Sequence, residues 1–127
     1  MSNSGQEIVN AFHESRNQLK QALVDLVSFG RKACNAEYAY RLRFRQEFFR
    51  LHYEDGVAWT ACADLARGEP DMEKDGKLVR GCASLRLSYY TAKTEHEASI
   101  EKINCIKTEL RFLETEINEA LGRGVRR

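Results

Sequence analysis

A chain of 127 residues is long enough for one compact domain and too short for two ordinary ones. Charged residues make up 31% and apolar residues 43%, with a single proline, which excludes a disordered chain and favours a helix-rich soluble protein. The formal net charge of +1 gives no bulk attraction for a polyanion. Because the sequence has no apolar run that spans a membrane and no secretory signal, we expect a cytoplasmic protein without a membrane partner.

The first segment, about 5–54, carries apolar or small residues at alternating steps of four and three, the period of a helix that packs along one seam. Gly30 interrupts this segment at a cost of about 1 kcal/mol relative to Ala, so one long helix and two nearly collinear helices both stay open. The seam residues are Ile8, Phe12, Ser15, Leu19, Ala22, Leu26, Phe29, Ala33, Ala36 and Tyr40, followed after one extra residue by Phe44, Phe48 and Leu51.

The connection that follows contains the only tryptophan and the only proline of the chain. Thr60 is a favourable cap for a short helix over about 61–67, and Gly68 suits the position just past its end. Pro70 fits the first turn of a following helix. The connection therefore predicts a short helix with a sharp stop, followed by a second long helix from about residue 72, although Gly76 and Gly81 weaken that start.

The second long helix is expected over about 72–121, with 122–127 as a basic tail. Its seam holds the alternating step for about six heptads. His96 and Ser99 are its two polar members, and a polar group in such a seam can fix register and oligomeric state. The seam residues are Leu78, Cys82, Leu85, Tyr89, Ala92, His96, Ser99, Ile103, Ile106, Leu110, Leu113, Ile117 and Ala120.

These elements predict an all-α fold in which a long antiparallel helical hairpin carries a short connecting helix. In antiparallel helices, facing residues have numbers with a constant sum. Placing Leu51 opposite Leu78 puts Tyr40 opposite Tyr89 and brings Ile8 near Leu121. Two helices alone bury little, so we expect a homo-oligomeric helical bundle, with a dimer favoured. The apolar side chains expected to be partly exposed are Leu23, Val27, Phe49 and Phe112.

Charge is uneven along the predicted hairpin. The run RLRFRQEFFR makes one end basic, whereas seven glutamates stand between Glu95 and Glu119 in the second helix. Arginines interleaved with aromatic residues are typical of phosphate and base binding and of protein interaction hot spots, although such arginines also pair with glutamates in solvated helices. The candidate binding residues are Arg41, Arg43, Arg45, Arg50, Trp59, Arg80, Arg86, Tyr89 and Tyr90.

Catalytic motifs are missing from the sequence. No nucleophile elbow, phosphate-binding glycine loop or zinc-protease motif is present. A carboxylate-bridged di-iron bundle uses Glu-x-x-His, but Lys93 stands three residues before His96 and Asn10 three before His13. We therefore predict a protein that is not an enzyme and has no catalytic residues, no metal site and no cofactor.

The four cysteines form no C-x-x-C pair. In a chain without an export signal, they are expected to be reduced and to act as small buried apolar residues. The weaker alternative is a zinc site near the connection, built from His52, Cys62 and Cys82. The cysteines are Cys34, Cys62, Cys82 and Cys105.

Two runs, YRLRFRQEFFRLHYEDGVAWTACADLARGEPD and RLSYYTAKTEHEASIEKINCIKTELRFLETEI, together resemble a class of small helical proteins encoded in early regions of tailed bacteriophages and prophages. The resemblance spans Tyr40 to Ile117. It rests on a basic helix, a short helix ending in the corner Ala66 to Pro70, and a long helix with a tyrosine-rich start. It implies a phage accessory protein in the cytoplasm of a bacterial host, and the class supplies no activity or functional residues to transfer. Gly76 and Gly81 depart from its uninterrupted helix.

Three functions stay open at this stage. The first is a non-enzymatic protein that occupies a host or phage protein, for example to inhibit a bacterial anti-phage defence such as CRISPR. The second is a helical oligomer that binds nucleic acid or sequesters a small nucleotide, and the third is a phage structural or assembly protein. The absence of catalytic motifs favours the first.

Overall fold

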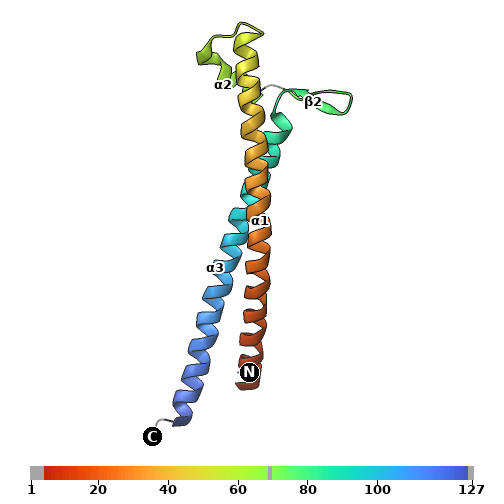
Figure 1. Ribbon diagram of the computed structural model, residues 1–127. Coiled ribbons are helices and arrows are strands. Elements are labelled where there is room, and N and C mark those ends of the chain that lie inside the picture. The colour runs from red at the N-terminus through yellow and green to blue at the C-terminus, as the bar shows by residue number, and fades with distance from the viewer. Residues whose placement is uncertain (1–4, 69, 126–127) are drawn as a thin grey trace. The chain divides into compact units, whose positions relative to one another are not determined.

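The computed structural model describes residues 5–68 and 70–125. It is helical apart from two short strands, as the composition and the apolar period predict. Among the described residues, no helix combines the length and the apolarity needed to cross a bilayer. The elements are α1 (Gly5–Tyr53), α2 (Trp59–Gly68), β1 (Met72–Lys74), β2 (Lys77–Arg80) and α3 (Ala83–Val125) (Figure 1).

The chain divides into two compact units. The terminal unit contains the residues up to Ser28 and those from Glu97 onward, and the central unit runs from Phe29 to His96. Each unit is held by its own packing between a part of α1 and a part of α3. The units are therefore described one at a time.

In the terminal unit, α1 and α3 pack along the predicted seam in antiparallel directions. Ala22, Ile103 and Ile106 form its buried centre. Ile8 and Leu121 line the same hollow at the open end, which confirms their expected proximity. The chain ends of the two helices lie at that end in Figure 1. Partly buried apolar residues that pack against the centre are Leu19, Leu26 and Leu110.

In the central unit, the same antiparallel register places Tyr40 against Tyr89, with ring centroids 5.7 Å apart. α1 is unbroken at Gly30, so the alternative of two collinear helices is wrong. A side-chain carbon at Gly30 would lie 3.4 Å from His96 Nε2, at van der Waals contact distance. Gly30 thus lies next to the half-buried imidazole of His96 in the seam.

The predicted pairing of facing residues does not hold at the end of the helical hairpin where α1 ends. Leu51 does not pack on Leu78 in a helix, because Leu78 belongs to strand β2. Leu51 instead forms a buried cluster with Cys62 and Ala66 of α2. The short helix α2 therefore takes the place of the second long helix along the last turns of α1 (Figure 1). Partly buried neighbours of this cluster are Phe44, Phe48 and Val57.

A β-hairpin replaces the predicted start of the second long helix at about residue 72. β1 and β2 pair in antiparallel fashion, with Lys74 opposite Lys77. The two residues between them, Asp75 and Gly76, have φ angles of 55° and 75°. Two successive positive φ angles define the turn that matches strand twist, and Asp-Gly is a preferred pair for it. α3 consequently begins at Ala83, and it extends to Val125, through the first part of the predicted basic tail; residues 126–127 lie outside the described residues.

The expected roles at the ends of α2 also need correction. α2 begins at Trp59, so Thr60 lies in its first turn and not at the cap. The carbonyl of Ala58 accepts a hydrogen bond from the Ala61 amide at 3.0 Å, which closes this first turn. The helix includes Gly68, one residue beyond the predicted end, and Pro70 precedes the β-hairpin and starts no helix.

Two of the four cysteines are buried and the other two are exposed. Cys62 and Cys82 are fully buried, as expected, whereas Cys34 and Cys105 are exposed, so the prediction is wrong for the latter two. The Cys82 thiol donates a hydrogen bond to the Ala66 carbonyl at 2.9 Å, and burial raises the pKa of this thiol. Cys82 thus acts as a neutral, polar link between α2 and the start of α3.

Candidate functional site

Two of the predicted binding arginines are parts of a buried ion network in the central unit. The Glu47 side chain is 2% exposed. Its two carboxylate oxygens contact Arg43 Nη2 at 3.1 Å and Arg50 Nη2 at 2.8 Å. Arg43 Nε also donates to the Gly81 carbonyl at 2.9 Å. Arg43 thus holds α1 to the segment before α3, and neither guanidinium group is free to bind an external phosphate.

Asp55 extends this network beyond the end of α1. Its Oδ2 atom accepts from Arg50 Nη1 at 2.8 Å and from Arg80 Nη2 at 2.7 Å. The hydrogen bond from Arg50 holds the pKa of Asp55 below its usual value, and the carboxylates of Glu47 and Asp55 raise the pKa of Arg50. Arg80 on β2 is thus tied to the last turn of α1. Arg43, Arg50 and Arg80 thus pair with acidic residues of the protein itself, which is the alternative to ligand binding that the sequence left open.

Asp71 organises the start of α3. Its Oδ1 atom accepts a hydrogen bond from the Ser84 backbone amide at 3.2 Å. Hydrogen bonds from Ser84 lower the pKa of this carboxyl group, since they favour the charged form. Asp71 therefore caps α3 from a position before the β-hairpin.

We expect Asp71→Ala to lower the free energy of unfolding at neutral pH by about 1 kcal/mol, the usual value of a helix cap. Because the folded-state pKa is lowered, this stabilisation is present above the ordinary carboxyl pKa and is lost as the pH falls through the lowered value. Urea unfolding at neutral pH and in acid should show a difference between variant and parent that shrinks on acidification. Asp64→Ala, at a side chain 87% exposed, serves as the control and should change little.

Trp59 is the centre of an aromatic cluster where α2 meets the end of α1. Its ring stacks on His52, with centroids 3.6 Å apart, and on Phe48, with centroids 5.4 Å apart. Phe49 and Tyr53 contact it edge-on. Trp59 remains 42% exposed, so it both anchors α2 and leaves one face accessible.

The predicted tyrosines have different roles. Tyr89 stacks on Tyr40 in the seam, where burial raises the pKa of Tyr40. Tyr90 is 47% exposed, and the guanidinium of Arg86 lies 5.6 Å from its ring centre. Tyr89 is thus a packing residue, whereas Arg86 and Tyr90 form an accessible cation and ring pair.

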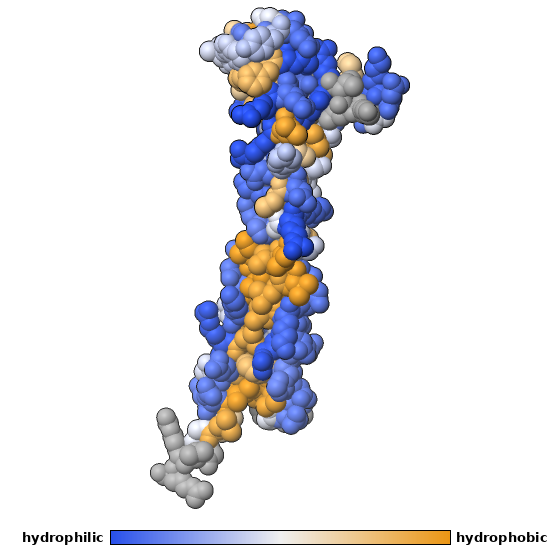
Figure 2. Space-filling model, in the orientation of Figure 1, coloured by the Kyte–Doolittle hydropathy of each residue, from blue (hydrophilic) through white to orange (hydrophobic). Residues whose placement is uncertain are grey.

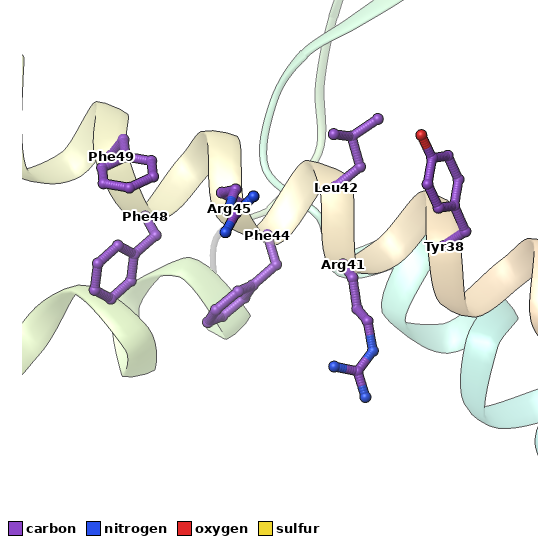
Figure 3. Close-up of a pocket in the computed structure, with 7 residues that line it drawn as sticks. All are labelled: Tyr38, Arg41, Leu42, Phe44, Arg45, Phe48 and Phe49. Atoms are coloured by element: carbon purple, nitrogen blue, oxygen red, sulfur yellow. The ribbon is translucent and has the colours of Figure 1, made fainter.

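An open groove runs along one side of α1 in the central unit. It measures about 580 Å³. In Figure 3, the rings of Phe44 and Phe48 lie on the side of α1 that faces α2, whereas Tyr38, Leu42 and Phe49 project from another side. We call it the α1 groove; its lining residues are Tyr38, Arg41, Leu42, Phe44, Arg45, Phe48 and Phe49.

The two remaining arginines of α1 stand at this groove. Arg41 is exposed and pairs with Glu37 one turn earlier, with Nε and Oε1 2.7 Å apart. Arg45 is exposed and makes no ion pair with any residue that the structure describes. Unlike Arg43 and Arg50, these side chains are available to an external partner.

The polar seam residues lie where the sequence places them, one in each unit. His96 is half-buried against Gly30 in the central unit, and Ser99 is buried in the terminal unit. Whether they set the oligomeric state stays a prediction. Within the described part of the chain, no three His, Cys, Asp or Glu side chains are grouped for metal binding, so the zinc alternative of His52, Cys62 and Cys82 has no support.

Sequence reasoning missed three features of this region. Tyr38 and Leu42 of the α1 groove were not selected, although with Phe49 they form a second apolar stripe beside the seam. Glu47 was not selected either, although its spacing of four from Arg43 and three from Arg50 is the spacing of helical ion pairs. Arg67 of α2, which lies over the Phe44 ring at 5.7 Å, was also missed.

Comparison of the chain with protein-family models, with curated proteins and with solved structures returned no match. No family assignment follows.

Proposed function

We propose that this protein is a non-enzymatic binding protein whose α1 groove receives an amphipathic helix of a partner protein. The observation that carries this proposal is the exposure of three large side chains on one face of α1. Tyr38 is 70% exposed, Leu42 46% and Phe49 44%. They project at intervals of four and seven residues, the spacing that a docked helix contacts along its length.

The charge beside this stripe favours an acidic partner. Arg41 and Arg45 line the groove together with its apolar residues. An aromatic and aliphatic centre with arginines at its edge is the composition of protein interaction hot spots. We therefore propose a partner helix with apolar residues three and four apart and carboxylates toward one edge.

The nucleic-acid alternative is weakened by the ion network. Arg43, Arg50 and Arg80 contact Glu47, Asp55 or backbone carbonyls, so three guanidinium groups of the predicted basic end are occupied internally. A phosphate backbone needs a row of accessible cations. Only Arg41 and Arg45 remain accessible on this stretch of α1.

The resemblance to small helical phage proteins suggests where to look for the partner. We propose a host or phage protein inside a bacterial cell, with a component of an anti-phage defence as the first class to test. A role in phage assembly stays the second alternative, because a helix-binding groove also serves an assembly protein. The pattern of Tyr40 to Ile117 supports this context and names no individual target.

Retention of bacterial proteins on the immobilised chain tests the proposal. Leu42→Glu places a charge in the α1 groove, whereas Leu65→Glu changes a leucine of matched exposure, 48%, on α2. We expect at least one protein to be retained by the parent and by Leu65→Glu and lost by Leu42→Glu. Arg45→Glu should weaken its retention as well, through repulsion of carboxylates. Identical retention by all variants would contradict the proposal.

We further propose that the terminal unit associates with a second copy of the chain. Figure 2 shows hydrophobic residues gathered in a stripe over this unit. On α1, Leu23, Val24 and Val27 are 44–64% exposed, beside a core of only two helices. Pairing two such apolar faces would complete a four-helix bundle, in which each protomer supplies the same patch.

Light scattering should give a particle of twice the 14.6 kDa chain mass. Leu23→Glu combined with Val27→Glu should reduce it to the mass of one chain, because two charges would be buried in the interface. Leu65→Glu, on α2, should leave the dimer intact. A parent protein that is monomeric at high concentration would overturn this assignment.

A further inference from the structure

A second, smaller pocket lies in the central unit between α2 and the first turns of α3. It measures about 290 Å³. We call it the α2–α3 pocket. Its lining residues are Arg67, Ala83, Arg86, Leu87 and Tyr90. None of them lines the α1 groove, although Arg67 lies 5.7 Å from the ring centre of Phe44, which does.

Two guanidinium groups line this pocket, and their positive charges are little neutralised by carboxylates of the protein itself. Arg86 forms no ion pair with any described residue, and its guanidinium group lies over the ring of Tyr90. Arg67 Nη1 contacts Asp64 Oδ1 at 3.0 Å, but the Asp64 side chain is 87% exposed. A solvated pair of this kind contributes little and exchanges readily for a better ligand. The pocket therefore presents two cations to solvent, in the planar, forked form that suits phosphate oxygens.

The backbone at the start of α3 does not supply this site. Asp71 already accepts the Ser84 amide, so a helix terminus that could hold an anion is capped from within. Recognition of an anion must come from the two arginine side chains. The ligand must therefore carry an anionic group that can contact both guanidinium groups.

The rest of the pocket is apolar and aromatic. Leu87 is 69% exposed and Tyr90 47% exposed, although both are large side chains that proteins usually cover. Arg86 lies 5.6 Å from the Tyr90 ring centre, so cation and ring share one edge of the pocket. A planar base can stack on an exposed tyrosine ring while its phosphate reaches the neighbouring guanidinium.

We propose that the α2–α3 pocket binds a nucleoside phosphate of mononucleotide size. Arg67 and Arg86 hold the phosphate, and the base lies against Tyr90 and Leu87. The volume is at the lower end of small-molecule sites, which suits one nucleotide. This site adds a small-molecule ligand to the proposed protein-binding function and does not depend on it.

Calorimetric titration of the full chain with AMP at low salt tests the site. We expect one AMP per chain at millimolar or better affinity. Arg86→Ala should weaken AMP binding about tenfold or more, since it removes a charge-assisted contact to phosphate. Tyr90→Leu should weaken AMP binding while leaving inorganic pyrophosphate unaffected, because pyrophosphate has no ring to stack. Helicity measured by circular dichroism verifies that each variant is folded.

A control variant distinguishes failure of the AMP site from failure of the protein-binding proposal. Arg45→Glu changes a residue of the α1 groove and should leave AMP binding unchanged, even though it weakens retention of the partner protein. If the parent shows no heat and no chemical-shift change with millimolar AMP, the proposal is overturned, whatever the outcome for the partner. Equal loss of AMP and pyrophosphate binding in Tyr90→Leu would also overturn it, since base stacking would then have no part. Unchanged AMP affinity in Arg86→Ala and Arg67→Ala would do the same.

Discussion

Glu47→Gln is expected to lower the free energy of unfolding by about 3 kcal/mol, although the two side chains have the same shape. The parent carboxylate is 2% exposed and lies between Arg43 and Arg50, whose side chains are 15% and 13% exposed. The amide removes the negative charge and leaves two nearly buried cations close together. Breaking one partner of a buried pair costs far more than the pair contributes, because the remaining charge stays desolvated.

Glu37→Gln is the matched control for this substitution. Glu37 pairs with Arg41 on the same helix, but these side chains are 39% and 72% exposed, so the change should cost less than about 0.5 kcal/mol. Urea unfolding followed by circular dichroism measures both variants. Equal effects of the two substitutions would mean that Glu47 is solvated in solution and that the ion network does not hold the central unit.

Leu51→Ala is expected to lower the free energy of unfolding by about 2–4 kcal/mol. Leu51 is 4% exposed and packs with Cys62 and Ala66, which are both fully buried. The substitution removes apolar contacts and leaves a cavity at the only buried cluster that the described residues form between α1 and α2. Leu42→Ala, at a leucine that is 46% exposed on the same helix, should cost much less in the isolated protein.

Fluorescence of Trp59 gives a local readout of the same substitution. Its ring stacks on His52 and Phe48 only while α2 is docked on α1. We expect this signal to change at lower urea in Leu51→Ala than in the parent. A small loss of stability together with an unaltered Trp59 transition would show that α2 is held mainly by the aromatic cluster.

The long helices and their register could be predicted because they depend on period alone. A seam with steps of four and three fixes which side chains face inward, and the constant sum then places Tyr40 on Tyr89 and Ile8 near Leu121. The expected exposure of Leu23, Val27, Phe49 and Phe112 is likewise confirmed, since two helices cannot cover all apolar flanks.

The end of the hairpin could have been predicted in part. Asp75-Gly76 is a strong turn signal, and it outweighs a helical apolar pattern that includes Leu78. The helical apolar pattern by itself starts the second helix about ten residues too early, before Ala83. The docking of α2 on Leu51 could not be predicted, because it depends on how three short segments fold back on α1.

Residue type alone does not predict which arginines of the candidate site are accessible. Arg43, Arg45 and Arg50 look alike in the sequence, but two of them face Glu47 and one lines an open groove. Helical spacing to Glu47 identifies the pairs within α1. Contacts of Arg43 with Gly81, and of Arg80 with Asp55, join segments far apart in the chain, and no local pattern encodes them.

The central claim is that the α1 groove receives an acidic amphipathic helix, and photocrosslinking tests it most directly. A benzophenone amino acid in place of Leu42, introduced in bacterial cells that contain the partner, should yield one major adduct. Peptide mapping should place the crosslink on a helical segment with apolar residues three and four apart and neighbouring carboxylates. The same amino acid in place of Leu65 should yield none of this adduct. Equal labelling from both positions, or a crosslink to a basic or non-helical segment, would contradict the claim.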